Sequence, residues 1–121
     1  MLVGLAAAGV RELIQHPERG QYLVAERAGR IVGSLMITPE WSDWRNGFFW
    51  WNQSVYVKSE YRRQGTYRVL HGAVLELARQ EKDVCGVRLY VKRDNINAQK
   101  TYQALGMYQT NYQLYEQIIN E

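Results

Sequence analysis

The second half of the chain alternates between strand-like and helical patterns, and this alternation limits the possible folds more than any other feature of the sequence. A long aromatic and β-branched run predicts a central strand, and the apolar residues at helical spacing after it predict the main helix. Together the patterns predict a strand at 48–57, a helix at 65–82, a strand at 87–91, a helix around 98–105 and a strand at 107–115. Strand, helix, strand, helix, strand is typical of an α/β fold with a partly parallel, mixed sheet.

The start of the chain has the pattern of an amphipathic helix over residues 2–15. The helix ends at His16, because the residue before Pro17 is disfavoured in helical geometry. Its apolar face consists of Val3, Ala6, Val10, Leu13 and Ile14.

A hairpin is predicted to follow this helix. Short strands at 21–26 and 30–37 are separated by Ala28-Gly29, which suits a tight turn. After the hairpin we expect a polar loop over residues 39–47. This loop carries Glu40, Trp41, Asp43 and Trp44.

Length and composition exclude several classes of protein. The 121 residues predict a single domain over 1–121, and 46% hydrophobic residues with 22% charged residues exclude a disordered or fibrous chain. One cysteine, Cys85, excludes an internal disulfide framework, and neither histidine has a second ligand at metal spacing, so no metal is expected. A net charge of +3 is too small to indicate nucleic-acid binding by itself. The apolar start is too short to cross a bilayer and lacks a cleavage pattern, so we expect a cytoplasmic protein without a membrane partner.

The junction between the central strand and the main helix has the features of an anion site. The strand end Val55-Tyr56-Val57 leads into a basic turn, and Gly65 opens the helix. Unpaired N–H groups at such a helix start, together with the helix dipole, favour phosphate binding. The turn and first helical residues are Arg62, Arg63, Gln64, Gly65, Thr66, Tyr67 and Arg68. Neither the P-loop pattern nor the dinucleotide-binding pattern is present, and an arginine-rich turn alone is more often a solvated surface.

A second motif, considered together with this junction, indicates a family. The chain resembles the GNAT superfamily of acetyl-CoA-dependent N-acetyltransferases over about residues 20–115. The family's pyrophosphate motif, Gln/Arg-x-x-Gly-x-Gly/Ala, is matched by Arg62 and Gly65 but not at Tyr67. Its later signature, Asn-x-x-Ala-x-x-x-Tyr-x-x-x-Gly-Phe, is matched except at the last position. The matching residues are Asn95, Ala98, Tyr102 and Gly106, and Met107 replaces the phenylalanine.

The resemblance implies an acetyl-CoA co-substrate and a role for each matched position. Residues Val55, Tyr56 and Val57 would pair with the pantetheine arm where their strand separates from the next one. Residues 62–68 would hold the pyrophosphate on backbone N–H groups. Asn95 would hydrogen-bond the pantetheine side, and Tyr102 would protonate the leaving thiolate as the general acid. A phenol with a pKa of about 10 keeps its proton near neutral pH, so tyrosine suits that role.

Three departures from the family pattern affect these expectations. The bulky side chain of Tyr67 must point away from the phosphates. The central strand carries no carboxylate, so the base could be Glu40 or Asp43, or the amine could arrive deprotonated. The usual first strand and helix of the family are expected to be lacking, which would leave a sheet edge that a second copy could cover in a homodimer.

The acceptor remains open between small-molecule and peptide amines. Glu40 and Asp43, beside the tryptophans, would suit a cationic amine, and Trp51 could line its pocket. The main alternative to an enzyme is a non-catalytic acetyl-CoA-binding module or a truncated inactive paralogue. A small RNA- or DNA-binding domain is the third possibility, although the mild net charge disfavours it.

Overall fold

The computed structural model describes residues 5–120. It divides into two compact units, the first ending at Tyr90 and the second starting at Val91. Each unit is described by itself, and the expected single domain stays a prediction. Val3, which we placed on the apolar face of the first helix, lies outside the described residues.

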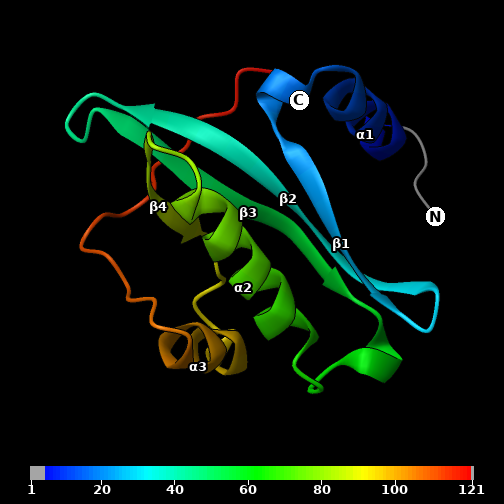
Figure 1. Ribbon diagram of the computed structural model, residues 1–121. Coiled ribbons are helices and arrows are strands. Elements are labelled where there is room, and N and C mark those ends of the chain that lie inside the picture. Colours follow the sequence, from blue (N-terminus) through cyan, green and yellow to red (C-terminus); the bar gives the residue numbers. More distant parts are fainter. Residues whose placement is uncertain (1–4, 121) are drawn as a thin grey trace. The chain divides into compact units, whose positions relative to one another are not determined.

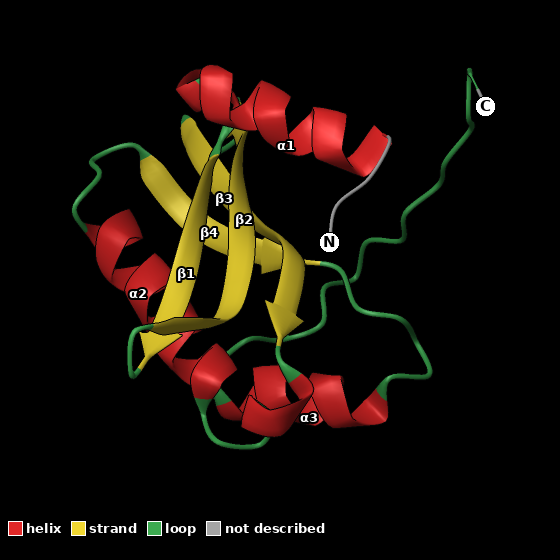
Figure 2. Ribbon diagram, turned by 90° about the vertical axis from the view of Figure 1, so that its right-hand side faces the viewer, coloured by secondary structure: helices red, strands yellow, loops and turns green. Residues whose placement is uncertain are grey.

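The first unit is a four-stranded mixed sheet with strand order β1-β2-β3-β4. β1 and β2 pair antiparallel, as do β2 and β3, whereas β3 and β4 are parallel. The helix α2 covers one face of the sheet, and α1 lies beside the end where β1 begins (Figures 1 and 2). The elements are α1 (Leu5–Gln15), β1 (Gln21–Arg27), β2 (Arg30–Ser42), β3 (Gly47–Val57), α2 (Thr66–Arg79) and β4 (Val84–Leu89). The predicted α/β class with a mixed sheet is confirmed.

The turn between β1 and β2 forms where the sequence predicts it. Ala28 and Gly29 have φ values of 52° and 76°, and Arg27 pairs directly with Arg30. Two positive φ values in a two-residue loop are the signature of a type I′ turn, whose twist matches that of paired strands.

The predicted polar loop over 39–47 is wrong, because most of it is strand. Glu40 pairs with Phe49 and Trp41 with Phe48, and the Trp41 and Phe48 rings meet edge to face with centroids 5.2 Å apart. These cross-strand contacts extend the ladder, because the side-chain pairs stabilise the sheet even though the segment contains polar residues. The actual turn is Asp43–Asn46, in which Asn46 has a φ of 47°.

The core lies between the sheet and α2. Leu35 and Ile37 from β2 pack there against Leu70 and Val74 from α2, and all four side chains are at least 98% buried. α2 ends at Arg79, earlier than the predicted residue 82, because the chain turns there to enter the sheet: the Phe48 N–H donates to the Asp83 carbonyl at 2.6 Å.

The strand after α2 starts three residues earlier than predicted. β4 spans Val84–Leu89 and not residues 87–91, because its ladder begins where Phe48 pairs with Val84. The apolar pattern alone does not show that this register extends the strand through Cys85 and Gly86.

The second unit contains the helix α3 (Ile96–Ala104) and the segment that follows it. The predicted strand at 107–115 is wrong, because these residues form neither helix nor strand. Their tyrosines are exposed, with Tyr108, Tyr112 and Tyr115 between 83% and 89% accessible. Alternation predicts a strand only where a second strand supplies a ladder, and the sequence does not show whether one is present. Among the described residues, no helix is both long and apolar enough to span a bilayer.

Candidate active site

β3 and β4 separate near the middle of the sheet. Their parallel ladder runs from Phe48–Val84 to Asn52–Leu89, and β3 then continues alone on that side to Val57. This fork is the strand separation that the family resemblance implies. Val55 and Tyr56 lie beyond it and are 38% and 53% exposed.

A β-bulge shifts the part of β3 that lies beyond the fork. The register with β2 passes from Met36–Gln53 to Ser34–Tyr56, and Ser54 has a φ of 51°. The extra residue re-aims the strand, which is a common use of bulges next to active sites.

The hydrogen bonds of β2 show which backbone groups of β3 face the open side. The Lys58 N–H donates to the Val32 carbonyl at 2.8 Å. Because successive residues of a strand present their N–H and C=O groups to opposite sides, the groups of Val57 face away from β2, whereas Val55 lies in the bulge, where this alternation is interrupted. The Val57 carbonyl accepts a hydrogen bond from Arg62 Nε at 3.0 Å. Beyond the fork, the side of β3 that faces away from β2 therefore carries no further strand among the described residues.

The basic turn before α2 forms an anion-binding geometry. Arg63 and Gly65 both have left-handed backbone, with φ values of 62° and 81°. Among the described residues, the N–H groups of Gln64, Gly65 and Thr66 have no hydrogen-bond acceptor. Successive N–H groups around left-handed residues make an anion-binding concavity, and the start of α2 adds its dipole.

Hydrogen bonds hold this turn in shape. The side chain of Gln64 donates to the Glu60 carbonyl at 2.9 Å and accepts from Arg27 at 2.6 Å. Thr66 Oγ1 donates to the Tyr61 carbonyl at 3.2 Å. The turn is therefore organised by its own contacts and by the β1–β2 hairpin. Arg62, Arg63 and Arg68 are exposed around it.

Tyr67 points into the core, as its size required. Its side chain packs against the core cluster, and its hydroxyl accepts a hydrogen bond from Asn52 Nδ2 at 3.3 Å. The tyrosine ring also lies beside His71, with centroids 5.8 Å apart. Asn52 is the last β3 residue paired with β4, so this contact joins the first turn of α2 to the fork. Burial lowers the pKa of His71, whose ring is therefore neutral near pH 7.

The second unit places Asn95 at the start of α3. Asn95 is the N-cap, and its Oδ1 accepts a hydrogen bond from the Ala98 N–H at 3.1 Å. At the other end of the helix, the Met107 N–H donates to the Tyr102 carbonyl and the Gly106 N–H donates to the Gln103 carbonyl. With a φ of 98° at Gly106, this is a Schellman cap.

Tyr102 lies on α3 and is partly buried. Burial raises its pKa above the usual value of 10 for a phenol. The side chain therefore holds its proton throughout the neutral range, which a general acid requires.

The proposed substrate residues divide into two groups. Glu40 and Trp51 are in contact, because Trp51 Nε1 donates to Glu40 Oε1 at 3.1 Å. Asp43 lies in the turn beyond the ladder, and among the described residues its carboxylate has no hydrogen-bond or ion-pair partner. Trp50 packs against the core cluster, so strand alternation directs Trp51 to the face opposite α2.

Sequence reasoning missed Arg88 and Tyr90 on that face. Arg88 forms an ion pair with Glu40 at 3.0 Å, and the Tyr90 ring stacks on Trp51 with centroids 4.4 Å apart. The available signal was a charged residue inside an otherwise apolar strand, at a position that alternates with the core residue Val87.

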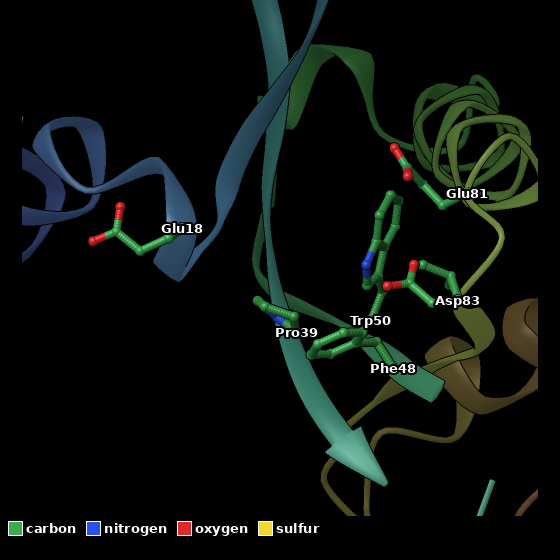
Figure 3. A pocket seen from close by; sticks show the side chains of 7 residues that line it. Glu18, Pro39, Phe48, Trp50, Glu81 and Asp83 are labelled. Carbon is green, nitrogen blue, oxygen red and sulfur yellow. The ribbon is translucent and has the colours of Figure 1, made fainter. Parts of the chain in front are cut away.

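A separate hollow of about 270 Å³ lies where β3 and β4 begin, at the end of their ladder away from the fork. Figure 3 shows the indole of Trp50 beside the carboxylates of Glu81 and Asp83. The hollow is lined by Glu18, Pro39, Phe48, Trp50, Glu81, Asp83 and Val84. It shares no residue with the basic turn or with the open part of β3.

A mixed sheet that opens between parallel strands, with a glycine-capped helix start beside the opening, defines an acetyltransferase type of fold. The model of the Acetyltransferase (GNAT) family matches residues 4–107. The chain therefore belongs to the GNAT acetyltransferase family. No significant match was found among curated proteins.

Solved structures of acetyltransferases share this fold. A possible acetyltransferase from Clostridium difficile 630 is 40% identical, with a TM-score of 0.87 over 97% of this chain and 77% of that chain. The aminoglycoside N-acetyltransferase AAC(6')-Iy in complex with CoA is 20% identical, with a TM-score of 0.77 over 94% and 86% of the two chains. The ribosomal-protein-alanine N-acetyltransferase from Brucella melitensis biovar Abortus 2308 is 16% identical, with a TM-score of 0.78 over 96% and 82%. At these last two identities the likeness concerns the fold alone.

Proposed function

We propose that the protein transfers the acetyl group of acetyl-CoA to a primary amine. The observation that carries this proposal is the fork, where β3 continues past the end of β4 through the exposed residues Val55 and Tyr56, together with the N–H groups of residues 64–66, which have no acceptor among the described residues. A pantetheine arm pairs with such an open strand as an added strand does, and a pyrophosphate fits the start of α2. The 3′-phosphate and pyrophosphate charges also suit the exposed arginines around the turn.

The chemical step is direct attack, without a protein nucleophile. The neutral amine nitrogen forms a bond to the thioester carbon, and the carbonyl oxygen becomes an oxyanion that a β3 backbone N–H stabilises. The C–S bond then breaks, and the thiolate takes a proton from Tyr102 to give free CoA. The nitrogen releases its extra proton, and the Tyr102 phenolate recovers a proton from solvent. The role of Tyr102 rests on the family motif and on its raised pKa.

The test is acetyl-CoA-dependent release of free CoA thiol in the presence of an amine, followed with a thiol reagent. Calorimetry with acetyl-CoA alone measures binding separately. We expect binding and amine-dependent thiol release. If the folded protein does not bind CoA at millimolar concentration, the proposal is wrong.

A non-catalytic acetyl-CoA-binding module is the second candidate. It is favoured because β3 carries no carboxylate and Glu40 is already engaged by Arg88. It predicts that acetyl-CoA raises the melting temperature while a broad panel of amines gives no turnover.

A further inference from the structure

The face of the sheet opposite α2 carries an ion pair next to the fork. Arg88 and Glu40 are joined across β2, β3 and β4, and Arg88 pairs in register with Trp51, one residue before the fork. The guanidinium carbon of Arg88 lies 3.5 Å from the centroid of the Phe49 ring. These contacts place both charges on an aromatic surface.

Part of each charged group is available to a ligand. Both hydrogen bonds to the Glu40 carboxylate, from Arg88 and Trp51, end on Oε1, so Oε2 has no partner among residues 5–120. Within the same residues, the guanidinium of Arg88 donates only to Glu40. The two side chains are 49% and 35% exposed, so the pair adds little to stability and can exchange partners with a ligand.

An aromatic surface lies beside the pair. Trp51 and Tyr90 stack with an interplanar angle of 26°, and Tyr90 is 58% exposed. A flat, partly accessible aromatic surface of this kind accepts an apolar or aromatic side chain of a ligand.

We propose that the amine acceptor is an α-amino acid, whose carboxylate binds Arg88 and whose amino group binds Glu40. This inference rests on the proposed function and concerns the acceptor half of the same site. A zwitterion carries both charges on one carbon and therefore satisfies both members of the pair when it exchanges with them. A planar guanidinium binds a carboxylate through two parallel hydrogen bonds, which fixes the orientation of the ligand.

The same arrangement opposes a polycationic acceptor. The charge of Glu40 is balanced by Arg88, so the cluster has no net negative charge. A polyamine could bind the carboxylate of Glu40, but the positive charge of Arg88 would repel it. The pair therefore selects against polycationic acceptors. The expectation that Glu40 and Asp43 together recruit a cationic amine is therefore replaced by recognition of a zwitterion.

The test compares L-phenylalanine with phenethylamine, which differs only in lacking the carboxylate, and adds spermidine as the polycation. The readout is amine-dependent release of free CoA thiol. We expect kcat/KM for phenylalanine to exceed that for the other two amines by at least about tenfold, because a charge-assisted hydrogen-bonded pair distinguishes the ligands. Equal or greater kcat/KM for phenethylamine or spermidine would overturn the inference and leave the proposed function standing. Binding of acetyl-CoA without turnover of any of a broad panel of amines would instead overturn both.

Variants locate the effect. Arg88→Gln is expected to raise KM for phenylalanine about 10–100-fold with kcat changed less, and to raise rather than lower kcat/KM for phenethylamine, because the repulsion of a cation by Arg88 is removed. Arg88→Lys, which keeps the charge but not the planar fork, should recover part of this loss. Arg79→Gln, at the exposed end of α2, removes one positive charge at a distant position and should leave kcat/KM unchanged for both amines. Melting temperatures of all variants establish that they fold. An equal loss with both amines in Arg88→Gln and Arg88→Lys would show that Arg88 has only a structural role.

Discussion

Replacing Gly65 by alanine should separate the anion-binding role of the basic turn from its conformational role. Gly65 has a φ of 81°, and a Cβ built on it meets no atom within 4 Å. The cost to folding is therefore conformational rather than steric. Left-handed backbone costs an L-residue about 1–2 kcal/mol. The lower entropy of the unfolded alanine chain returns about 0.4–1 kcal/mol, so the net loss should be about 1 kcal/mol.

Gly29 provides a matched control for this substitution. Its φ is 76°, and a Cβ there also meets no atom within 4 Å, but it lies in the β1–β2 turn. Gly29→Ala should therefore lose about the same stability, which corresponds to about 4 °C in melting temperature for a chain of this size. The two variants should differ only in binding, because the added methyl group of Gly65→Ala lies where a pyrophosphate would approach the backbone N–H groups.

Urea unfolding and calorimetry with acetyl-CoA measure the two effects separately. We expect Gly65→Ala to weaken acetyl-CoA binding at least about tenfold and Gly29→Ala to leave it unchanged, because close backbone approach to a phosphate requires the absence of a Cβ. Wild-type affinity in Gly65→Ala, at the expected loss of stability, would show that the turn is not the pyrophosphate site.

Four further substitutions test other parts of the structure. Tyr102→Phe should lower kcat about 10²–10⁴-fold with little change in acetyl-CoA affinity, and an equal loss of kcat and affinity would contradict the acid role. Since burial raises the pKa of Tyr102, wild-type activity that depends on this acid should persist to above pH 10. Because burial lowers the pKa of His71, the unfolded chain binds a proton at mildly acidic pH that the folded chain does not. The stability contributed by this group should therefore be full above about pH 6.5 and fall as the pH drops from there to the lowered pKa. A pH series of urea melts should show a smaller fall in His71→Leu. Gly47→Ala should lower the free energy of unfolding by about 1–3 kcal/mol, because its Cβ would lie 2.8 Å from the Asp83 carbonyl oxygen. Gly72→Ala should raise the free energy of unfolding in the same urea assay, because its Cβ would meet open space on the helix α2.

The sequence predicted the elements whose formation depends on local patterns. The Ala28-Gly29 turn, the start of α2 after Gly65 and the end of α3 before Gly106 all depend on residues within a few positions of one another. The errors concern long-range pairing. The extension of β2 through Glu40 and Trp41 depends on Phe48 and Phe49, which lie after the turn, and the early start of β4 depends on its register with β3.

The same distinction applies to the candidate site. The basic turn and the motif around Tyr102 can be recognised along the chain, because each is one contiguous segment. The partner of Glu40 could not be, because Arg88 is 48 residues away and only the parallel pairing of β3 with β4 brings the two together. Asn52 and Tyr67 present the same difficulty, since their hydrogen bond joins a strand to a helix across the basic turn.

For Asn95, the structural and functional interpretations of the motif are compatible. The N-cap uses only Oδ1, which accepts from Ala98, so the Nδ2 donors of Asn95 have no acceptor among the described residues. The spacing from Asn95 to Ala98 is that of an N-cap and its N3 donor, and the spacing from Tyr102 to Gly106 is that of a Schellman cap. Both spacings therefore have a folding reason that is independent of catalysis. A helix fixed at both ends holds Asn95 and Tyr102 two turns apart on a rigid frame, which is the arrangement required of two residues that bind one ligand.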